Sequence, residues 1–261
     1  MKQAILPPEM EPFRPQVEQS RCSFIRVEPL AEGASQPWKS KIGGLAYQPK
    51  GHQWPVSPDG NPLFFLGQIN FAELPALHPF PEKGILQFFI NDDDLYGMDF
   101  DQGEVADTFR VVFHPDPIED ASQLDASAYS PESYDLLPHQ PEDSFPLAFH
   151  LDSEVVPVTD YRFWETFGQD FFQQFGAAEW EVLDTYSKLV KPQGHKVGGY
   201  AYFTQDDPRK PEDPMLLLFQ LDSDQHMNLM WGDMGVGHFF VRESDLAKRD
   251  FSRVLYDWDC L

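Results

Sequence analysis

One seven-residue phrase occurs twice in this sequence and constrains the fold more than any other feature. Residues 41–47 read KIGGLAY and residues 196–202 read KVGGYAY, so five of the seven positions are identical. Three more stretches match in the same order along the chain, namely 62–70 with 214–222, 84–90 with 235–241, and 110–113 with 253–256. Four matches in register predict two copies of one β-rich unit and a fold with approximate two-fold symmetry.

The apolar runs of both copies have the length of strands. They are four to eight residues long and end at Gly, Pro, Asn or Asp, which favours strands over helices. An alternating segment at residues 22–28 predicts one more strand. Residues 115–160 are rich in Pro, Asp, Glu and Ser and predict a loop-rich connection, with a strand at 145–149 as an option.

The best helical pattern lies between Tyr161 and Leu189. Aromatic residues recur there at three- and four-residue steps, Gly176 interrupts the run, and Pro192 follows its end. The pattern predicts two helices with a core-facing aromatic stripe.

We therefore expect an α+β, mainly β fold of two fused pseudo-symmetric β-rich repeats with flanking helices. A chain of 261 residues with 41 % apolar side chains can bury one sizeable core. We expect a single domain over residues 1–261, with repeat one at about 40–115, an acidic loop and helices at 116–194, and repeat two at about 195–261.

The charge of the chain limits its partners. The net charge is −24, from 43 acidic and 19 basic side chains. Such a surface repels nucleic acid and anionic membranes, and it speeds the encounter with a basic protein. General solubility is the plainer interpretation of the same charge. We expect no nucleic-acid and no membrane partner.

Targeting signals and cysteine spacing point to the cytoplasm. The first residues lack the apolar stretch of a signal peptide, and no apolar run approaches the ~20 residues of a membrane span. Cys22 and Cys260 form neither a metal-ligand spacing nor a disulfide framework. We expect a cytoplasmic protein with reduced thiols, and a disulfide joining the two ends stays open.

Several segments resemble the YwqG family of uncharacterised bacterial proteins. The segments that carry the resemblance are 40–44, 54–55, 66–70, 84–89, 195–199, 230–237 and 250–256. The resemblance spans about residues 22–259 and implies a mainly β fold with flanking helices. One departure is His238, where the family more often has an aromatic residue. The family brings no established activity, but some members are placed among toxin–immunity genes, which implies a role as an inhibitor.

Polar residues at matching strand ends are the candidate binding site. They would meet where the two repeats meet, with carboxylates on one side, amides on the other and two tryptophans as apolar walls. The candidates are Gln68, Asn70, Gln87, Gln220, Asp222, Asp233, Trp54 and Trp231. The alternative is structural, because buried amides also bond to neighbouring backbone.

The repeated Lys-x-Gly-Gly phrase is a second candidate, for binding an anion. Adjacent glycines permit positive φ and expose N–H groups as a nest beside the lysine. The residues are Lys41, Gly43 and Gly44 in one copy, and Lys196, Gly198 and Gly199 in the other. A tight turn with a purely structural role is the alternative.

Motifs for catalysis and for metals are absent or incomplete in the sequence. The acidic segment at 91–101 fails the Ca²⁺-loop pattern, because Tyr96 and Gly103 stand at ligand positions 5 and 12 of a loop that starts at Asp92. No nucleophile elbow or Walker loop occurs. We predict no cofactor, no metal and no catalytic residue. The leading hypothesis is a protein-interaction module or immunity-type inhibitor; a small-molecule or metal-binding groove between the repeats, and a hydrolase of unknown type, are the alternatives.

Overall fold

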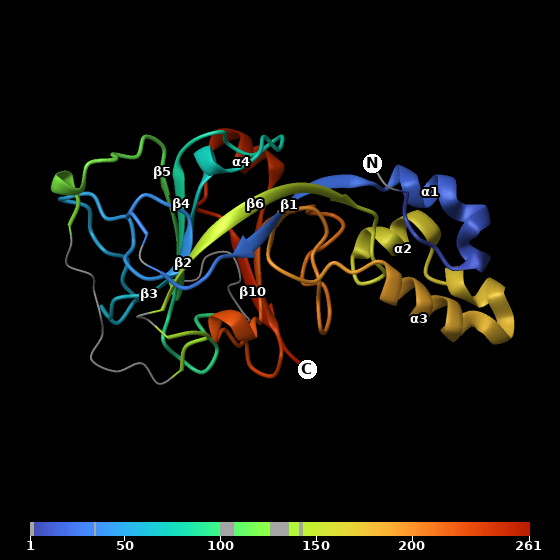
Figure 1. The fold of residues 1–261 in the computed structure, drawn as a ribbon. Coiled ribbons are helices and arrows are strands. Elements are labelled where there is room, and N and C mark those ends of the chain that lie inside the picture. Colours follow the sequence, from blue (N-terminus) through green and yellow to red (C-terminus); the bar gives the residue numbers. More distant parts are fainter. Residues whose placement is uncertain (1–2, 34, 100–106, 126–135, 141–142) are drawn as a thin grey trace.

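A computed structural model describes residues 3–33, 35–99, 107–125, 136–140 and 143–261. In these residues one ten-stranded sheet dominates, every adjacent strand pair is antiparallel, and the order is β10-β9-β8-β7-β1-β6-β2-β3-β4-β5 (Figure 1). The strands are β1 (Cys22–Pro29), β2 (Lys41–Gly43), β3 (Phe64–Asn70), β4 (Ile85–Ile90), β5 (Phe109–His114), β6 (Ser144–Glu154), β7 (Lys196–Gly198), β8 (Leu216–Asp222), β9 (Val236–Val241) and β10 (Leu255–Asp259). The expected α+β, mainly β class is confirmed.

The order of the strands is alike on the two sides of a central pair. β1 pairs along its whole length with residues 147–154 of β6, β2 to β5 follow on one side, and β7 to β10 follow on the other. The register shifts between Phe65 and Gly67 in β3, and between Leu217 and Phe219 in β8. These shifts fall at matching places of the repeated phrases. Superposition of residues 40–115 on 195–259 stays a prediction.

The two sides of the sheet face one another across the main core. The ring of Phe88 on β4 lies 5.0 Å from that of Phe219 and 4.6 Å from that of Phe239, centroid to centroid. At the two ends of the sheet, the ring of Phe109 on β5 lies 5.2 Å from that of Tyr256 on β10. The end strands therefore approach each other, and the sheet is nearly closed.

Two strands, one on each side of the central pair, are buried on both faces. All residues of β4 and of β9 are buried, which explains why their apolar residues stand at successive positions instead of alternating; Gln87 and His238 are the polar exceptions. The apolar runs of the two copies predict core residues at six positions, and all six are at most 1 % exposed; they are Leu66, Phe88, Phe89, Leu218, Phe239 and Phe240.

β6 corrects the sequence interpretation of the connecting region. A short strand at 145–149 was an option within a loop-rich stretch, whereas the structure has an eleven-residue strand. The second half of this strand carries exposed residues such as His150 and Asp152, so the amino-acid composition of this half resembles that of a loop. Pairing with β1 and β2 supplies the hydrogen bonds that keep the segment extended.

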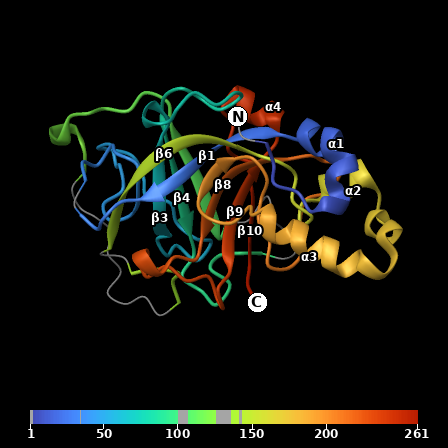
Figure 2. The same cartoon turned by 45° about the vertical axis from the view of Figure 1, so that its right-hand side comes forward.

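The helices form a second, smaller core beside the sheet, next to the ends of β1 and β6 (Figures 1 and 2). The α-helices are α1 (Arg14–Gln19), α2 (Tyr161–Phe167), α3 (Glu179–Leu189) and, apart from this core, α4 (Glu243–Lys248). Short 3₁₀ turns are η1 (Pro8–Phe13), η2 (Phe71–Glu73), η3 (Ala121–Gln123), η4 (Phe171–Ala178) and η5 (Gln225–Met227).

The aromatic run departs from the two-helix prediction. α2 ends at Phe167 because Gly168 has a φ of 90°, and η4 continues the run as a 3₁₀ turn. The expected break at Gly176 is present, with a φ of 55°. The aromatic stripe faces the small core, where Phe163, Phe171 and Phe172 are buried.

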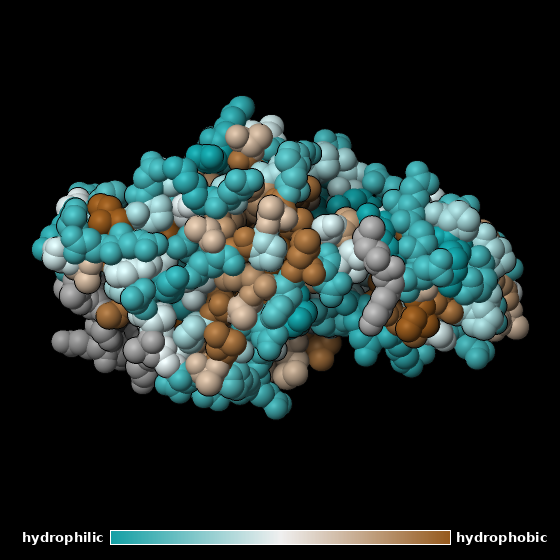
Figure 3. Space-filling model, turned by 45° about the horizontal axis from the view of Figure 1, so that its top comes forward, coloured by the Kyte–Doolittle hydropathy of each residue, from teal (hydrophilic) through white to brown (hydrophobic). Residues whose placement is uncertain are grey.

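The surface seen in Figure 3 is mostly hydrophilic, with hydrophobic residues gathered in patches near its middle. No helix among the described residues is long and apolar enough to cross a membrane.

Candidate functional site: a groove along the end of the sheet

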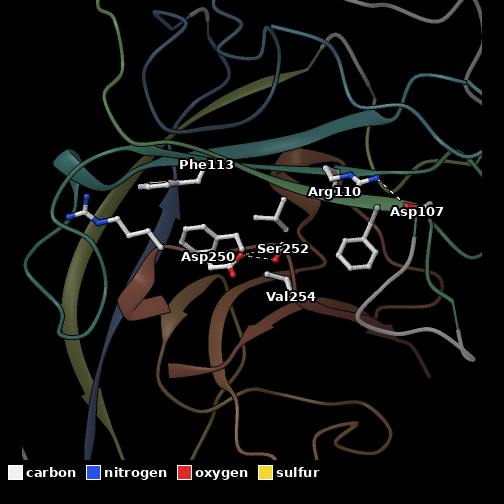
Figure 4. A pocket seen from close by; sticks show the side chains of 10 residues that line it. Asp107, Arg110, Phe113, Asp250, Ser252 and Val254 are labelled. Atoms are coloured by element: carbon white, nitrogen blue, oxygen red, sulfur yellow. Dashed lines mark hydrogen bonds and ion pairs between the residues drawn. The ribbon is translucent and has the colours of Figure 1, made fainter. Parts of the chain in front are cut away.

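A groove of about 310 Å³ lies between β5 and the chain segment that leads into β10 (Figure 4). One wall belongs to β5, on the side of the sheet with β2 to β5. The other wall belongs to residues 249–254, which lead into β10 on the side with β7 to β10. The lining residues are Asp107, Phe109, Arg110, Val111 and Phe113, and opposite them Arg249, Asp250, Phe251, Ser252 and Val254. The groove therefore lies where the two sides of the sheet meet.

β5 offers this groove backbone groups that have no partner among the described residues. It stands at the end of the strand order and pairs only with β4 among the described strands. The N–H of Asn91 donates to the carbonyl of Thr108 at 2.8 Å, so Thr108 and every second residue after it direct their backbone groups toward β4. Because bonding alternates along an antiparallel strand, Phe109, Val111 and Phe113 direct their N–H and C=O groups away from β4. These three residues are lining residues of the groove.

The base of the groove is aromatic. The side chains of Phe109, Val111 and Phe113 share one face of β5, since successive side chains alternate between faces. The ring of Phe113 lies 5.1 Å from that of Phe251 on the opposite wall. These contacts join the groove to the main core, so its base is firmly held.

Charged side chains stand at the rims. Arg110 lies 3.4 Å from the carboxylate of Asp107 on the β5 side. On the other side, Asp250 accepts hydrogen bonds from the Ser252 N–H at 3.0 Å and from its hydroxyl at 2.6 Å. These bonds lower the pKa of Asp250 and keep it anionic. Each wall thus carries one arginine and one aspartate beside an apolar base.

A second hollow continues past Arg249. It has a volume of about 460 Å³ and is lined by residues 79–83 together with Leu246, Ala247 and Arg249. Arg249 belongs to both hollows and lies just after α4 in a left-handed conformation with a φ of 59°. The concave surface is therefore longer than the groove alone.

The predicted glutamines hold neighbouring loops by equivalent bonds. The side-chain oxygen of Gln68 accepts from the Tyr47 N–H, and its amide nitrogen donates to the carbonyls of residues 37 and 39. Gln220 accepts from the Tyr202 N–H and donates to the carbonyls of residues 192 and 194. Both side chains are fully buried. These bonds favour the structural interpretation.

Three further candidates also bond within their own side of the sheet. Asn70 donates to the Trp38 carbonyl at 2.9 Å. Gln87 donates to the Tyr47 carbonyl and lies 3.1 Å from the oxygen of Gln68. Asp222 accepts from the Gly194 N–H at 2.7 Å.

The remaining candidates are dispersed. Trp54 packs edge-on against Phe89 at 5.2 Å, Trp231 is fully buried in the main core, and Asp233 is exposed. None of the eight predicted binding residues lines the groove beside β5. Their role in binding stays a prediction.

A third hollow, of about 330 Å³, contains Asp222 and Lys196. His195 shares it and is held by two bonds. Its Nδ1 accepts from the Asp222 N–H at 3.0 Å, so Nε2 carries the proton and donates to Asp224 at 3.1 Å. Both ring nitrogens are thus used within the chain.

The glycines of the two Lys-x-Gly-Gly phrases have the same backbone conformation in both copies, and anion binding there stays a prediction. Their φ values are 65° and 67° at Gly43 and Gly44, and 73° and 78° at Gly198 and Gly199. All four therefore lie in the left-handed region that favours glycine.

Other chemistry-bearing groups are accounted for by local structure. Asp93, in the acidic segment, accepts from the N–H groups of Leu95 and Gly97 and so shapes a turn. Among the residues described, no three His, Cys, Asp or Glu side chains are placed to share a metal ion. Burial raises the pKa of the Cys22 thiol to about 12, so it is not a thiolate at neutral pH.

The groove residues were not singled out from the sequence. The signal was present, because residues 109–114 read FRVVFH and match residues in the second copy. What sequence reasoning lacked was the strand order, which alone places β5 at the end of the sheet and opposite residues 249–254.

Residues 40–260 match a family described as a domain of unknown function (DUF1963). The chain belongs to this family. The match agrees with an uncharacterised family, as the sequence motifs predict, while the narrower YwqG assignment stays a prediction. No curated protein matches the chain.

Proposed function

We propose that this DUF1963 protein is a protein-interaction module that binds an extended segment of a partner along the free edge of β5. The observation that carries the proposal is the coincidence, at Phe109, Val111 and Phe113, of backbone groups without a strand partner among the described residues and a groove with an aromatic base. An added strand would pair with these groups, as in other cases of strand addition to a sheet edge.

The geometry also defines the side chains that the partner segment presents. In a strand, alternate side chains point to the same face, so every second residue would enter the groove. The aromatic base formed by Phe113 and Phe251 favours apolar residues there. The five positions from 109 to 113 span roughly 16 Å at 3.3 Å per residue, which suits a segment of about five residues.

The negative charge of the chain favours a positively charged partner. The net charge of −24 attracts a basic protein, and at physiological salt screening limits this attraction to a range of about 8 Å. We therefore commit to a basic partner whose segment has alternating apolar residues flanked by Lys or Arg. An immunity-type inhibitor of a basic target is one form of such a module, and the YwqG resemblance supports it.

Selection from a displayed library of random 12-residue peptides tests the proposal. We expect enrichment of sequences with alternating apolar residues and basic flanks. Binding of a selected peptide to the Val111→Pro variant should fall at least tenfold, because proline removes the outward N–H and an edge strand tolerates it. Val111→Ile keeps that N–H and is the matched control.

The result that would overturn the proposal is equally specific. Circular dichroism must first show that Val111→Pro is folded. If this folded variant binds the selected peptides as tightly as Val111→Ile does, the backbone edge is not the binding surface. Enriched peptides that are acidic would contradict the charge argument.

A further inference from the structure

The second Lys-x-Gly-Gly turn contains an anion that belongs to the chain itself. The carboxylate of Glu154 accepts from the Lys196 ammonium at 2.7 and 2.9 Å and from the Tyr200 N–H at 2.7 Å. The side chain of Glu154 is 12 % exposed and that of Lys196 is 2 % exposed. The turn, the lysine and the next N–H therefore form a nest whose occupant is a carboxylate.

The first Lys-x-Gly-Gly turn has the same backbone. Gly43 and Gly44 have positive φ values like those of Gly198 and Gly199. Lys41 pairs with Gln68 in the sheet, as Lys196 pairs with Gln220. By this correspondence, the Leu45 N–H stands where the Tyr200 N–H stands in the second turn.

No carboxylate occupies the first turn within the described part of the chain. Lys41 is 1 % exposed, and among the residues that the structure describes its ammonium donates only to the Gln36 carbonyl, at 3.2 Å. Burial lowers the pKa of Lys41 and the negative charge of Glu73 raises it in part, but Glu73 forms its ion pair with Lys39 and not with Lys41. The Leu45 N–H has no hydrogen-bond partner among the described residues. A buried ammonium with one neutral partner is energetically unfavourable.

The surroundings of the first turn provide a further donor. A Cβ on Gly199 would lie 2.2 Å from the Glu154 carboxylate, whereas a Cβ on Gly44 would lie 2.6 Å from the Ser144 hydroxyl. Ser144 therefore has the same position relative to the first turn that Glu154 has relative to the second turn. Leu45 is 49 % exposed, so the outer side of this turn reaches the surface.

We propose that the turn at residues 41–45 binds a carboxylate supplied by a ligand. The Lys41 ammonium and the Leu45 N–H take the roles that Lys196 and Tyr200 have around Glu154, and the Ser144 hydroxyl donates a third bond. The ligand chemistry is inferred from the occupied turn, where the same backbone holds a carboxylate. This site is separate from the β5 groove and does not depend on its function.

The first measurement is a titration of the Lys41 ammonium by NMR, with acetate added at constant ionic strength against chloride. Burial lowers the pKa of Lys41 to about 8, and a bound carboxylate favours the charged form. We expect acetate to raise this pKa by about one unit, which corresponds to a tenfold preference for the charged form. Acetate binding should be strongest between about pH 5, where the acid is ionised, and about pH 8, and it should weaken as pH rises through the upper value.

The source of the carboxylate is tested with two probes. One is acetate, and the other is a short peptide amide with a single glutamate, compared with its glutamine counterpart. Tighter binding of the glutamate peptide than of acetate would assign a polypeptide source, and the reverse order a free small acid. Either result supports the proposal.

Variants separate a binding site from a structural turn. Ser144→Ala should weaken acetate binding severalfold while the protein stays folded, and Lys41→Met should abolish it. Lys191→Met removes an exposed lysine and is the matched control. The proposal is overturned if neither probe shifts the Lys41 pKa, as would happen if a carboxylate of the chain occupied the turn, or if Ser144→Ala binds acetate like the parent protein.

Discussion

The ring of Phe88 on β4 lies 4.6 Å from the ring of Phe239 on β9, although these strands stand on opposite sides of the sheet order. Both residues are fully buried. This contact joins the two sides of the sheet through the main core. We expect Phe239→Ala to lower the free energy of unfolding by ~3–5 kcal/mol, the usual cost of removing a buried ring.

Denaturant titration followed by fluorescence measures this loss. Trp180 is 75 % exposed, so Trp180→Ala is a control that should change the unfolding free energy by less than ~0.5 kcal/mol. An unchanged midpoint for Phe239→Ala would contradict the packing of the two sides.

Gln68 and Gln220 should contribute equally to stability. Each side chain bonds to three backbone groups, and methionine has a similar shape without the hydrogen bonds. Each Gln→Met change should cost about 3 kcal/mol or more, because an unsatisfied buried group costs ~1–3 kcal/mol. Gln53→Met, at an exposed position, is the control. Unequal losses would show that the two turns differ in structure, and small losses for both would favour a binding role instead.

The buried pair of Lys196 and Glu154 should show strong coupling. Burial lowers the pKa of Lys196, while the charge of Glu154 opposes that shift. Glu154→Gln leaves an ammonium without its counter-charge and should cost ~3–5 kcal/mol. Lys196→Met should cost a similar amount for the same reason.

A double-mutant cycle measures that coupling. The variant with both changes should lose clearly less than the sum of the single losses, since it removes both charges together. Additive losses in urea titrations would mean that the ion pair makes no net contribution beyond each side chain alone.

Asp257 should make stability depend on pH near neutrality. Burial, with Asp259 and Asp207 nearby, raises the pKa of Asp257 from 3.8 to about 7. Between these values the folded state keeps a proton that the unfolded state releases, so the unfolding free energy falls as pH rises. His238, whose Nδ1 lies 3.9 Å from Asp257, is held neutral by burial and supplies no balancing charge.

Asp257→Asn removes this dependence. The variant should equal the parent near pH 4 and exceed it by up to about 4 kcal/mol at about pH 8, because each pKa unit corresponds to about 1.4 kcal/mol. The measurement is the unfolding free energy of both proteins across that range. Parallel pH curves for the two proteins would rule out the proposed protonation of Asp257.

The sequence predicts most of the strands and core because both depend on local apolar pattern. Phe88, Phe239 and their neighbours lie in short apolar runs, and each is buried as expected. β6 was the exception, since its second half carries polar residues and its extended form depends on pairing with β1, far away in the sequence. Local pattern cannot show such a partner.

The candidate site was less predictable for a related reason. Gln68 and Gln220 look alike whether they bond to a ligand or to backbone, and only coordinates show that backbone groups surround them. The occupant of the Lys196 nest, Glu154, lies outside both repeats and therefore has no counterpart in the aligned phrases. Lys196 belongs to a repeat and Glu154 to the segment between the repeats. Their spacing in the sequence therefore does not recur, and no motif search would detect this pair.

The central position of β1 has a consequence for how this molecule is made on the ribosome. β1 emerges early, yet its partners β6 and β7 are synthesised much later. During that interval both edges of β1 lack their native partners, and neither side of the sheet has its central support. Pairing between distant segments folds slowly, and unpaired edges favour aggregation. We therefore expect chaperones that shield nascent chains to raise the yield of folded protein more than slower synthesis of the last strands would.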